Sequence, residues 1–390
     1  MPRQPRLPAQ TRRNYLSTAV VLGALSVGHC YNPDPDVAAG YITRAMDLAA
    51  ELGDPDVAAE VLMARLITYS GVATHSHQVP ELIEQLFALG HRQSRVDTVI
   101  AHSIATMATM NLGEVDAATR HLRHGIEGSE DLGLPVLRAQ LRWMEAVIAF
   151  WRGDFTETRR HHEIAARVHE QTELYVAGSG MVATMALSRD QGLVTVGSVA
   201  DEAELVQWIR GLIAAGGDTG LAGVVAAGAA TTTGTPVDRD LADAMIRQWL
   251  AARTAHVWTT LGHAVLLAHL VADHGLVEHA DAFLTELELF ADRIAIIGQV
   301  GVVGPVAFAL ARLHACAGDD DRARRFNDQA RTLAVDTGGV PSALRCRLLE
   351  CSLQSPSAAR TRELDDIARA AFALGMNGLV TEVRRIASSA

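Results

Sequence analysis

Residues 134–172 read LPVLRAQLRWMEAVIAFWRGDFTETRRHHEIAARVHEQT, and this stretch decides the fold class. Its first half is rich in apolar residues and ends at Arg152, whereas its second half, from Asp154, is more charged. Gly153 and Asp154 stand between the two halves. Glycine accepts the left-handed conformation that closes one helix, and aspartate caps the start of the next. The stretch therefore predicts a hairpin of two helices.

A glycine in the same phase returns along the chain every 39 to 43 residues. The glycines of this series are Gly71, Gly113, Gly153, Gly192, Gly234, Gly275 and Gly318. Cys30, 41 residues before the first of them, marks the same phase. A fixed period of about 40 residues is typical of stacked helical hairpins. The sequence therefore predicts an all-α fold, an α-solenoid of about nine hairpins, and not helices with accidental spacing.

We expect one helical domain over residues 14–388, behind a flexible N-terminus of residues 1–13. The expected helix pairs are Asn14–Tyr31 with Pro35–Gly53, Asp54–Ser70 with Val79–Gly90, Arg95–Leu112 with Glu114–Gly133, Leu134–Arg152 with Asp154–Thr172, Glu173–Gln191 with Asp201–Ala215, Leu221–Thr233 with Pro236–Arg253, Thr254–His274 with Leu276–Arg293, Gly304–Ala317 with Asp319–Gly338, and Pro341–Leu353 with Ser357–Gly375. Gly378–Ser388 is expected as a capping helix. An irregularity is expected near 192–236, and the strand-like run at 192–199 is interpreted as a loop because it has no partner strand.

The charge of the chain argues against nucleic acid as a direct partner. The net charge is −11, and arginines are scattered among carboxylates instead of forming one basic stretch. Binding to nucleic acid needs such a positive surface. A small basic cluster occurs only at the N-terminus, at Arg3, Arg6, Arg12 and Arg13. All 34 basic residues are arginine, since the chain contains no lysine.

The cysteines and the N-terminus bear on the cellular compartment. The cysteines, Cys30, Cys316, Cys346 and Cys351, include no C-x-x-C pair and are too few for a disulfide framework, which predicts a reduced cytoplasmic setting. TRRNYL at 11–16 resembles a twin-arginine export signal, but no Ala-x-Ala cleavage site follows. We interpret residues 15–31 as the first helix instead. No run of 18 apolar residues occurs, so no membrane-spanning helix is expected.

The hairpins resemble expanded tetratricopeptide repeats. Besides the Gly-Asp and Gly-Glu joints, the phrases LGDPD (52–56), WRGDF (151–155) and GPVAFALARL (304–313) are similar to the C-terminal helical region of large bacterial ATPase or LuxR-type transcriptional regulators and nucleotide cyclases. The resemblance covers about residues 15–375. It implies a right-handed solenoid that takes part in transcriptional regulation. The phosphate-binding G-x-x-x-x-G-K-[ST] loop of that family cannot exist in a chain without lysine.

In tetratricopeptide repeats the first helix of each hairpin lines a concave groove, and the resemblance implies that side chains facing this groove bind the effector. The residues so implied are Arg65, Tyr69, Met107, Met110, Asn111, Gln140, Trp143, Trp151, Arg189, Asp190, His269, Asp273, Phe308 and Arg312. Trp143 and Trp151 are eight residues apart and would share a helix face with adaptable methionines beside them. The alternative is that Trp143, Phe150 and Met107 are core residues between helices, because a register error of one residue would move them there.

Two functions follow from this pattern. The first is a non-enzymatic binding module that takes a protein, a peptide or a small-molecule effector in its groove, alone or as a homodimer. The second is an enzyme or ligand-binding protein of specialised metabolism on the same scaffold, with His269, Asp273, Arg189, Asp190 and Arg312 as acid–base and anion-binding groups. No cofactor or metal is expected. His75-Ser76-His77 and the charged run 159–163 are interpreted as solvated segments, since neither has metal-ligand spacing.

Overall fold

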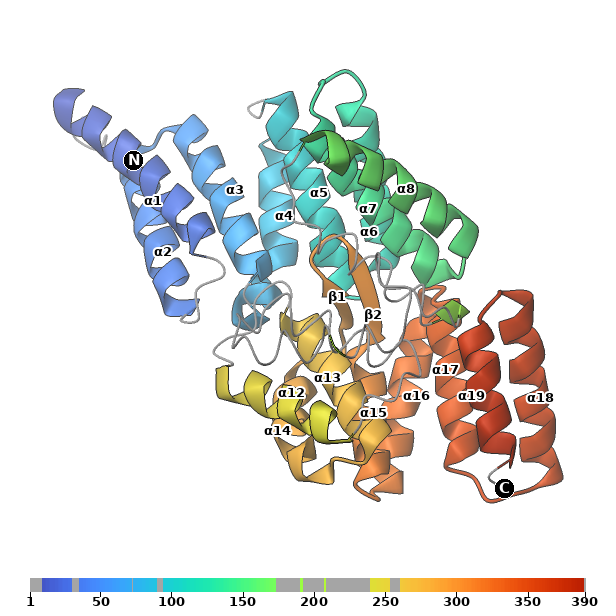
Figure 1. Cartoon of the computed structure of the whole chain (residues 1–390). Coiled ribbons are helices and arrows are strands. Elements are labelled where there is room, and N and C mark those ends of the chain that lie inside the picture. The colour runs from blue at the N-terminus through green and yellow to red at the C-terminus, as the bar shows by residue number, and fades with distance from the viewer. Residues whose placement is uncertain are drawn as a thin grey trace.

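The computed structural model describes residues 9–29, 35–71, 73–89, 94–172, 190–191, 207, 239–252 and 260–388. Nearly all of these residues are helical (Figure 1), so the prediction of a mostly helical fold is confirmed. The expected irregularity near 192–236 and the hairpins between residues 173 and 238 lie outside the described residues, apart from residues 190–191 and 207.

The N-terminal helices pack largely in sequential pairs. They are α1 (Ala9–Gly28), α2 (Pro35–Leu52), α3 (Pro55–Gly71), the 3₁₀ helix η1 (Ala73–Gln78), α4 (Val79–Ala88), α5 (Arg95–Asn111), α6 (Val115–Ser129), α7 (Pro135–Arg152) and α8 (Phe155–Thr172). α1 contacts α2, α5 contacts α6 and α7 contacts α8 most extensively, as the hairpin pattern predicts. α1 also packs on α3, and it begins at Ala9, earlier than the predicted start at residue 14.

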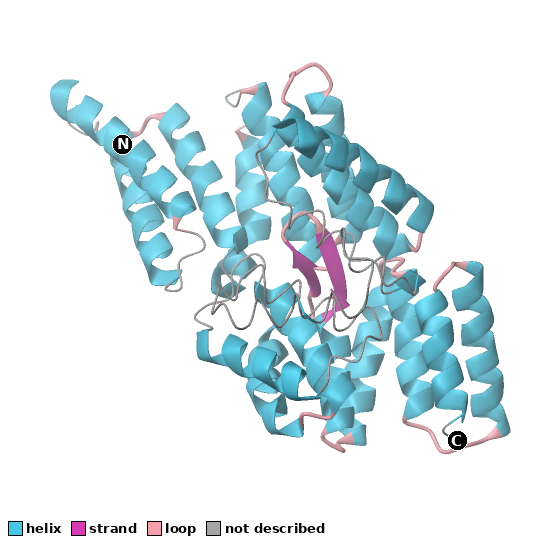
Figure 2. Cartoon of the chain, viewed as in Figure 1, coloured by secondary structure: helices cyan, strands magenta, loops and turns pink. Residues whose placement is uncertain are grey.

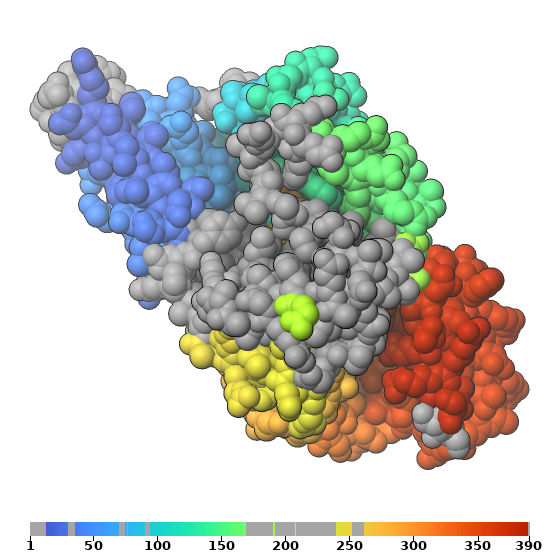
Figure 3. Space-filling model, in the orientation of Figure 1, coloured from blue at the N-terminus to red at the C-terminus, as the bar shows by residue number. Residues whose placement is uncertain are grey.

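The C-terminal part continues the helical arrangement. Its elements are α12 (Arg239–Ala252), α13 (Thr260–His274), η3 (Val277–His279), α14 (Ala280–Leu287), η4 (Glu288–Phe290), α15 (Val306–Cys316), α16 (Asp320–Asp336), α17 (Val340–Ser352), α18 (Ala358–Ala373) and α19 (Asn377–Ser388). Figure 3 shows α1 and α2 at one end of the molecule and α18 and α19 at the other. Among the described helices, none combines the length and the apolar character that crossing a bilayer would require.

Joint glycines close several of these helices. Gly113, Gly153, Gly275 and Gly318 have φ between +61° and +81°, the left-handed conformation predicted for them. Gly71 differs, because it is the last residue of α3. Asp154 and Asp319 follow two of the joints, and their side chains accept hydrogen bonds from the amides of Glu157 and Arg322. The local signals at these joints therefore act as the sequence predicted.

Gly153→Val is expected to destabilise the protein by about 1–2 kcal/mol, since a side chain disfavours the left-handed conformation. The added Cβ itself would meet only ordinary contacts, 3.6 Å from Pro341 Cδ and from Val340 Cβ, so the cost is expected in the backbone. The thermal midpoint measures it. Gly153→Asn is the control, because asparagine tolerates this conformation and should lose less. Equal midpoints for both variants and the wild type would show that backbone strain at this joint is unimportant.

A β-hairpin that the sequence did not predict lies in the middle of the chain's arrangement (Figure 2). β1 (Ile294–Ile297) and β2 (Gly301–Pro305) pair antiparallel, with an irregularity between Ala295 and Ile296. All residues of both strands are buried. β1 contacts α5 and α13, and β2 contacts α7, α13, α15 and α16. The hairpin therefore joins the N-terminal helices to the C-terminal ones.

Further contacts join parts of the chain that are far apart in sequence. α7 packs directly on α17, and the indole Nε1 of Trp151 donates a hydrogen bond to the carbonyl oxygen of Thr337, 3.1 Å away. The amide of Gln299 donates to Ser103 Oγ at 3.0 Å. A linear solenoid, in which each repeat contacts only its neighbours, does not account for these contacts.

Candidate binding pocket

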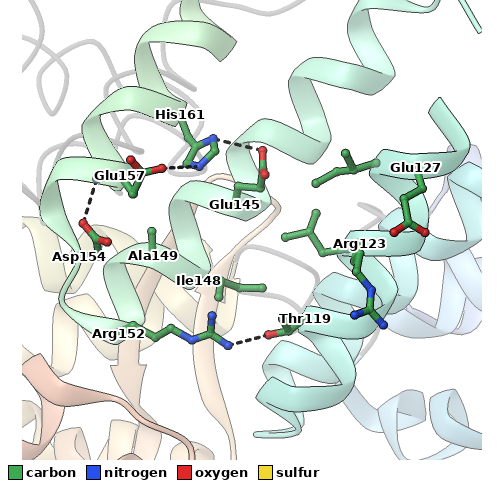
Figure 4. Close-up of a pocket in the computed structure, with 12 residues that line it drawn as sticks. Thr119, Arg123, Glu127, Glu145, Ile148, Ala149, Arg152, Asp154, Glu157 and His161 are labelled. Carbon is green, nitrogen blue, oxygen red and sulfur yellow. Dashed lines mark hydrogen bonds and ion pairs between the residues drawn. The ribbon is translucent and has the colours of Figure 1, made fainter. Parts of the chain in front are cut away.

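A hollow of about 510 Å³ lies between α6 and α8, with α7 as its floor (Figure 4). Its lining residues are Thr119, Leu122, Arg123, Ile126 and Glu127 of α6, Glu145, Ile148, Ala149 and Arg152 of α7, and Asp154, Glu157 and His161 at the start of α8 and within it. The four α7 residues occupy positions i, i+3, i+4 and i+7, so they share one helix face. We call this hollow the α6–α8 pocket.

The floor of the α6–α8 pocket is apolar and firmly packed. Leu122 and Ile148 are only 5% and 4% exposed, and both belong to the core that α5, α6 and α7 share. Ile126 and Ala149 are half-buried beside them. Because the floor consists of core side chains on rigid helices, the pocket is preformed.

One end of the pocket holds a histidine between two carboxylates. Nδ1 of His161 lies 3.1 Å from Oε2 of Glu145, and Nε2 lies 3.5 Å from Oε2 of Glu157. Arg142 also pairs with Glu145. Burial acts to raise the pKa of the Glu145 carboxyl, but the hydrogen bond and charge of His161, together with Arg142, outweigh it and hold that pKa below its usual range. Glu145 is therefore ionised at neutral pH, and its charge is met by its neighbours.

The opposite end carries two exposed arginines (Figure 4). Arg152 donates a hydrogen bond to Thr119 Oγ1 at 3.1 Å, and Arg123 projects from α6 beside them. Within the described part of the chain, neither guanidinium has a carboxylate partner. Guanidinium groups bind carboxylates and phosphates through paired N–H donors. This end of the pocket can therefore bind an anion.

A second hollow, of about 470 Å³, lies between α2, α3 and α4. Its lining is mainly apolar, and it includes Arg65 from the predicted set. Arg65 donates to Gln78 Oε1 at 2.8 Å and lies over the ring of Tyr69, 5.1 Å from its centroid. Two predicted residues therefore meet here, but Tyr69 is only 6% exposed and Arg65 is already bound within the protein.

The structure corrects the predicted groove position of the central aromatic and methionine residues. Met107, Met110, Trp143 and Trp151 are at most 2% exposed. Met107, Met110 and Trp151 belong to one core cluster, and Trp143 packs against His162, with ring centroids 5.4 Å apart. Asn111 donates to the carbonyl oxygen of Ile294 in β1 at 2.9 Å. These side chains hold the helices and the β-hairpin together. The α7 face that lines the α6–α8 pocket is not the face that carries Trp143 and Trp151.

The remaining predicted residues lie largely in the C-terminal helices. Asp273 of α13 and Arg312 of α15 form an ion pair, and His269 contacts the ring of Phe308, 5.7 Å between centroids. Asp190 pairs with Arg345, whose guanidinium also lies 3.7 Å from Glu382. Carboxylates and guanidinium groups thus neutralise one another here. Gln140 lies half-buried on α7, and Arg189 falls outside the described residues.

Sequence reasoning missed the α6–α8 pocket because it placed the site on the first helix of each hairpin alone. Most of the pocket comes from the second helices α6 and α8, and the charged run 159–163 of α8 was interpreted as a solvated segment, although His161 within it is buried. No protein-family model matches the sequence, and no curated protein matches it with significance.

Proposed function

We propose that the chain is a non-enzymatic helical-repeat binding module that takes its effector in the α6–α8 pocket and acts in transcriptional regulation. The observation that carries the proposal is a preformed apolar hollow with two exposed guanidinium groups at one end that lack carboxylate partners among the described residues. The regulatory context follows from the resemblance to the helical regions of bacterial transcriptional regulators.

The scaffold that we propose is a right-handed solenoid of about nine hairpins, closed across its middle by the β-hairpin. The extensive contacts of α1 with α2, α5 with α6 and α7 with α8 support hairpins as its unit. The joint glycines with positive φ support the period of about 40 residues. On this scaffold the effector site lies between successive second helices, in place of the concave groove that the sequence suggested.

Four carboxylates also line the pocket, namely Glu127, Glu145, Asp154 and Glu157. The arginine end therefore favours an amphipathic anion whose charged group lies at that end. Leu122, Ile126 and Ile148 offer an apolar floor to an aliphatic body. Arg123 and Arg152 offer charged donors to a carboxylate or a phosphate. The volume of about 510 Å³ falls within the range of about 300–1,000 Å³ that small-molecule sites occupy.

Decanoate is therefore expected to bind more tightly than decylamine, which has an aliphatic chain of the same length and the opposite charge. Isothermal titration measures both affinities. Arg152→Ala should weaken decanoate binding about 10- to 100-fold, because a hydrogen bond to a charged group contributes about 1.5–3 kcal/mol.

Arg65→Ala is the matched control, since Arg65 lines the other hollow and binds Gln78. Its affinity for decanoate should equal that of the wild type. Equal binding of decanoate and decylamine, or an unchanged affinity in Arg152→Ala, would contradict the proposed ligand class.

A further inference from the structure

The helix α1, at one end of the molecule (Figure 3), exposes an unusual amount of apolar surface. From Asn14 to Gly28 it contains no charged residue. Nine large apolar residues are exposed in the described part of the chain, and three of them lie on α1, namely Leu16, Val21 and Leu25. Exposed apolar residues that gather on one element mark an interaction surface more often than scattered ones do.

The inner face of α1 is engaged within the chain. Ser26 is buried, and its hydroxyl donates a hydrogen bond to the carbonyl oxygen of Ala38 in α2 at 2.9 Å. The same hydroxyl lies 2.8 Å from Thr68 Oγ1 in α3. Leu22 and Ala19, one and two turns earlier, are buried on the same side. The exposed residues of α1 therefore lie on the side that faces away from α2 and α3.

We call this side the outer face. Its residues recur at intervals of three and four along one stripe of the helix, and all are exposed and uncharged: Asn14, Ser17, Thr18, Val21, Ala24, Leu25 and Gly28. Val21 and Leu25 form its centre and are 55% and 40% exposed. An outermost helix of a helical array usually presents a polar surface to water. α19, at the other end of the molecule, does so with exposed Arg384 and Arg385, whereas α1 does not.

The outer face is complementary to itself about a two-fold axis at Val21. When two such helices pair antiparallel, residues at equal distances on either side of Val21 meet across the contact. Leu25 of one copy then meets Ser17 of the second copy, and Gly28 meets Asn14. The largest side chain of the outer face therefore packs on one of the smallest, which lets the two backbones approach closely. Such self-complementary two-fold contacts are the commonest kind in homo-oligomers.

The charges at the two ends of α1 favour the antiparallel direction. Exposed Arg13 lies just before the outer face. Antiparallel pairing brings it to the last turn of the second copy's α1, where carbonyl groups carry partial negative charge. The exposed acidic residue Asp36 begins α2 beside that turn, since Ser26 bonds to Ala38. Parallel pairing would instead bring the two Arg13 side chains together.

We propose that the outer face of α1 binds the outer face of a second copy of this chain, antiparallel about Val21, so that the protein forms a homodimer. The contact spans about four helical turns and buries less surface than the about 1,200–2,000 Å² of stable interfaces. We therefore expect a reversible dimer with a dissociation constant of about 1–100 µM. α1 lines no part of the α6–α8 pocket, so this interface is independent of the proposed effector function.

Sedimentation velocity of the full-length protein, at concentrations from about 1 to 200 µM, tests the proposal. The wild type should change from monomer to dimer across this range. Val21→Glu should abolish the dimer, because it places two carboxylates against each other on the two-fold axis. Val335→Glu is the matched control, since Val335 is 62% exposed on α16, and it should dimerise like the wild type. Circular dichroism should show the same helical content in both variants, because both positions are exposed.

A paired introduction of charges tests the antiparallel direction. Leu25→Glu alone should abolish the dimer, because it brings a carboxylate into the apolar contact. Ser17→Arg combined with Leu25→Glu should restore it to within about 10-fold of the wild-type dissociation constant, since each new guanidinium then meets a new carboxylate of the second copy. Within one chain the two positions are about 12 Å apart along the helix, which is too far for an ion pair. In a parallel dimer the same double variant would place like charges together.

The proposal is overturned if the wild type is still monomeric at about 200 µM, or if Val335→Glu abolishes the dimer as Val21→Glu does. It is also overturned if the double variant dimerises no better than Leu25→Glu. Flotation of the wild-type monomer with phosphatidylglycerol vesicles, without any dimer, would overturn it as well, because a lipid surface would then be what covers the outer face.

Discussion

Replacing Trp151 by alanine is expected to lower the free energy of unfolding by about 3–5 kcal/mol, the usual cost of truncating a buried tryptophan. The side chain is 1% exposed and lies where α7 meets α17. It approaches Gly339 so closely that a Cβ at that glycine would be 2.4 Å from the indole. Truncation leaves a cavity and removes the donor to the Thr337 carbonyl, which is 3.1 Å from Nε1. Both losses weaken the joint between the two halves of the chain.

Urea unfolding followed by circular dichroism measures this loss. Phe372→Ala is the matched control, because Phe372 is an aromatic residue that is 71% exposed, and its truncation should change the free energy by less than about 0.5 kcal/mol. A loss below about 1 kcal/mol in Trp151→Ala would show that this side chain is not a core residue. Trp151 would then be a candidate groove residue, as the sequence suggested.

Acidification to pH 5 is expected to remove about 4 kcal/mol of stability through two buried histidines, about 2 kcal/mol from each. Burial lowers the pKa of His162 to about 4, with the charge of His161 as a further cause. Burial lowers the pKa of His263 to about 3. In the unfolded chain both imidazoles titrate near pH 6.5. Between these values the unfolded state binds more protons, so stability is complete above about pH 6.5 and falls as the pH decreases toward the folded-state pKa values.

Denaturant unfolding at pH 7 and pH 5 tests this dependence. His263→Met replaces the imidazole with an apolar side chain that can still pack against Trp249. In this variant the loss of stability between pH 7 and pH 5 should be smaller by about 2 kcal/mol. Glu145 contributes little in this window, because His161 and Arg142 hold the pKa of its carboxyl below its usual range. The same stability at both pH values in the wild type would contradict the burial of neutral histidines.

The helix joints could be predicted from the sequence because their signals are local. A glycine followed by aspartate or glutamate determines both the end of one helix and the start of the next, and Gly113, Gly153 and Gly318 have the positive φ expected of them. The hairpin of β1 and β2 could not be predicted in the same way. Its strands are buried on both faces, so they lack the alternation of apolar and polar residues that identifies a strand.

The site could be predicted only in part, because the sequence does not show which face of a helix meets a distant segment. Trp143 and Trp151 are compatible with a groove or with a core, and the contact of Trp151 with Thr337 decides for the core. Asp273 and Arg312 were placed on neighbouring first helices, and they do form an ion pair. The α6–α8 pocket depends on how α6, α7 and α8 pack.

Hydrogen–deuterium exchange with and without decanoate tests most directly whether the effector site is the α6–α8 pocket. The expected result is slower exchange in peptides from residues 115–129 and 135–161 when decanoate is present, with no change in residues 35–71. The same experiment with Arg152→Ala should show little protection at the same concentration. Protection confined to α3, α13 and α15, which carry residues of the groove implied by the tetratricopeptide resemblance and line no part of the α6–α8 pocket, would contradict the assignment of the site. A complete absence of protection would contradict it as well.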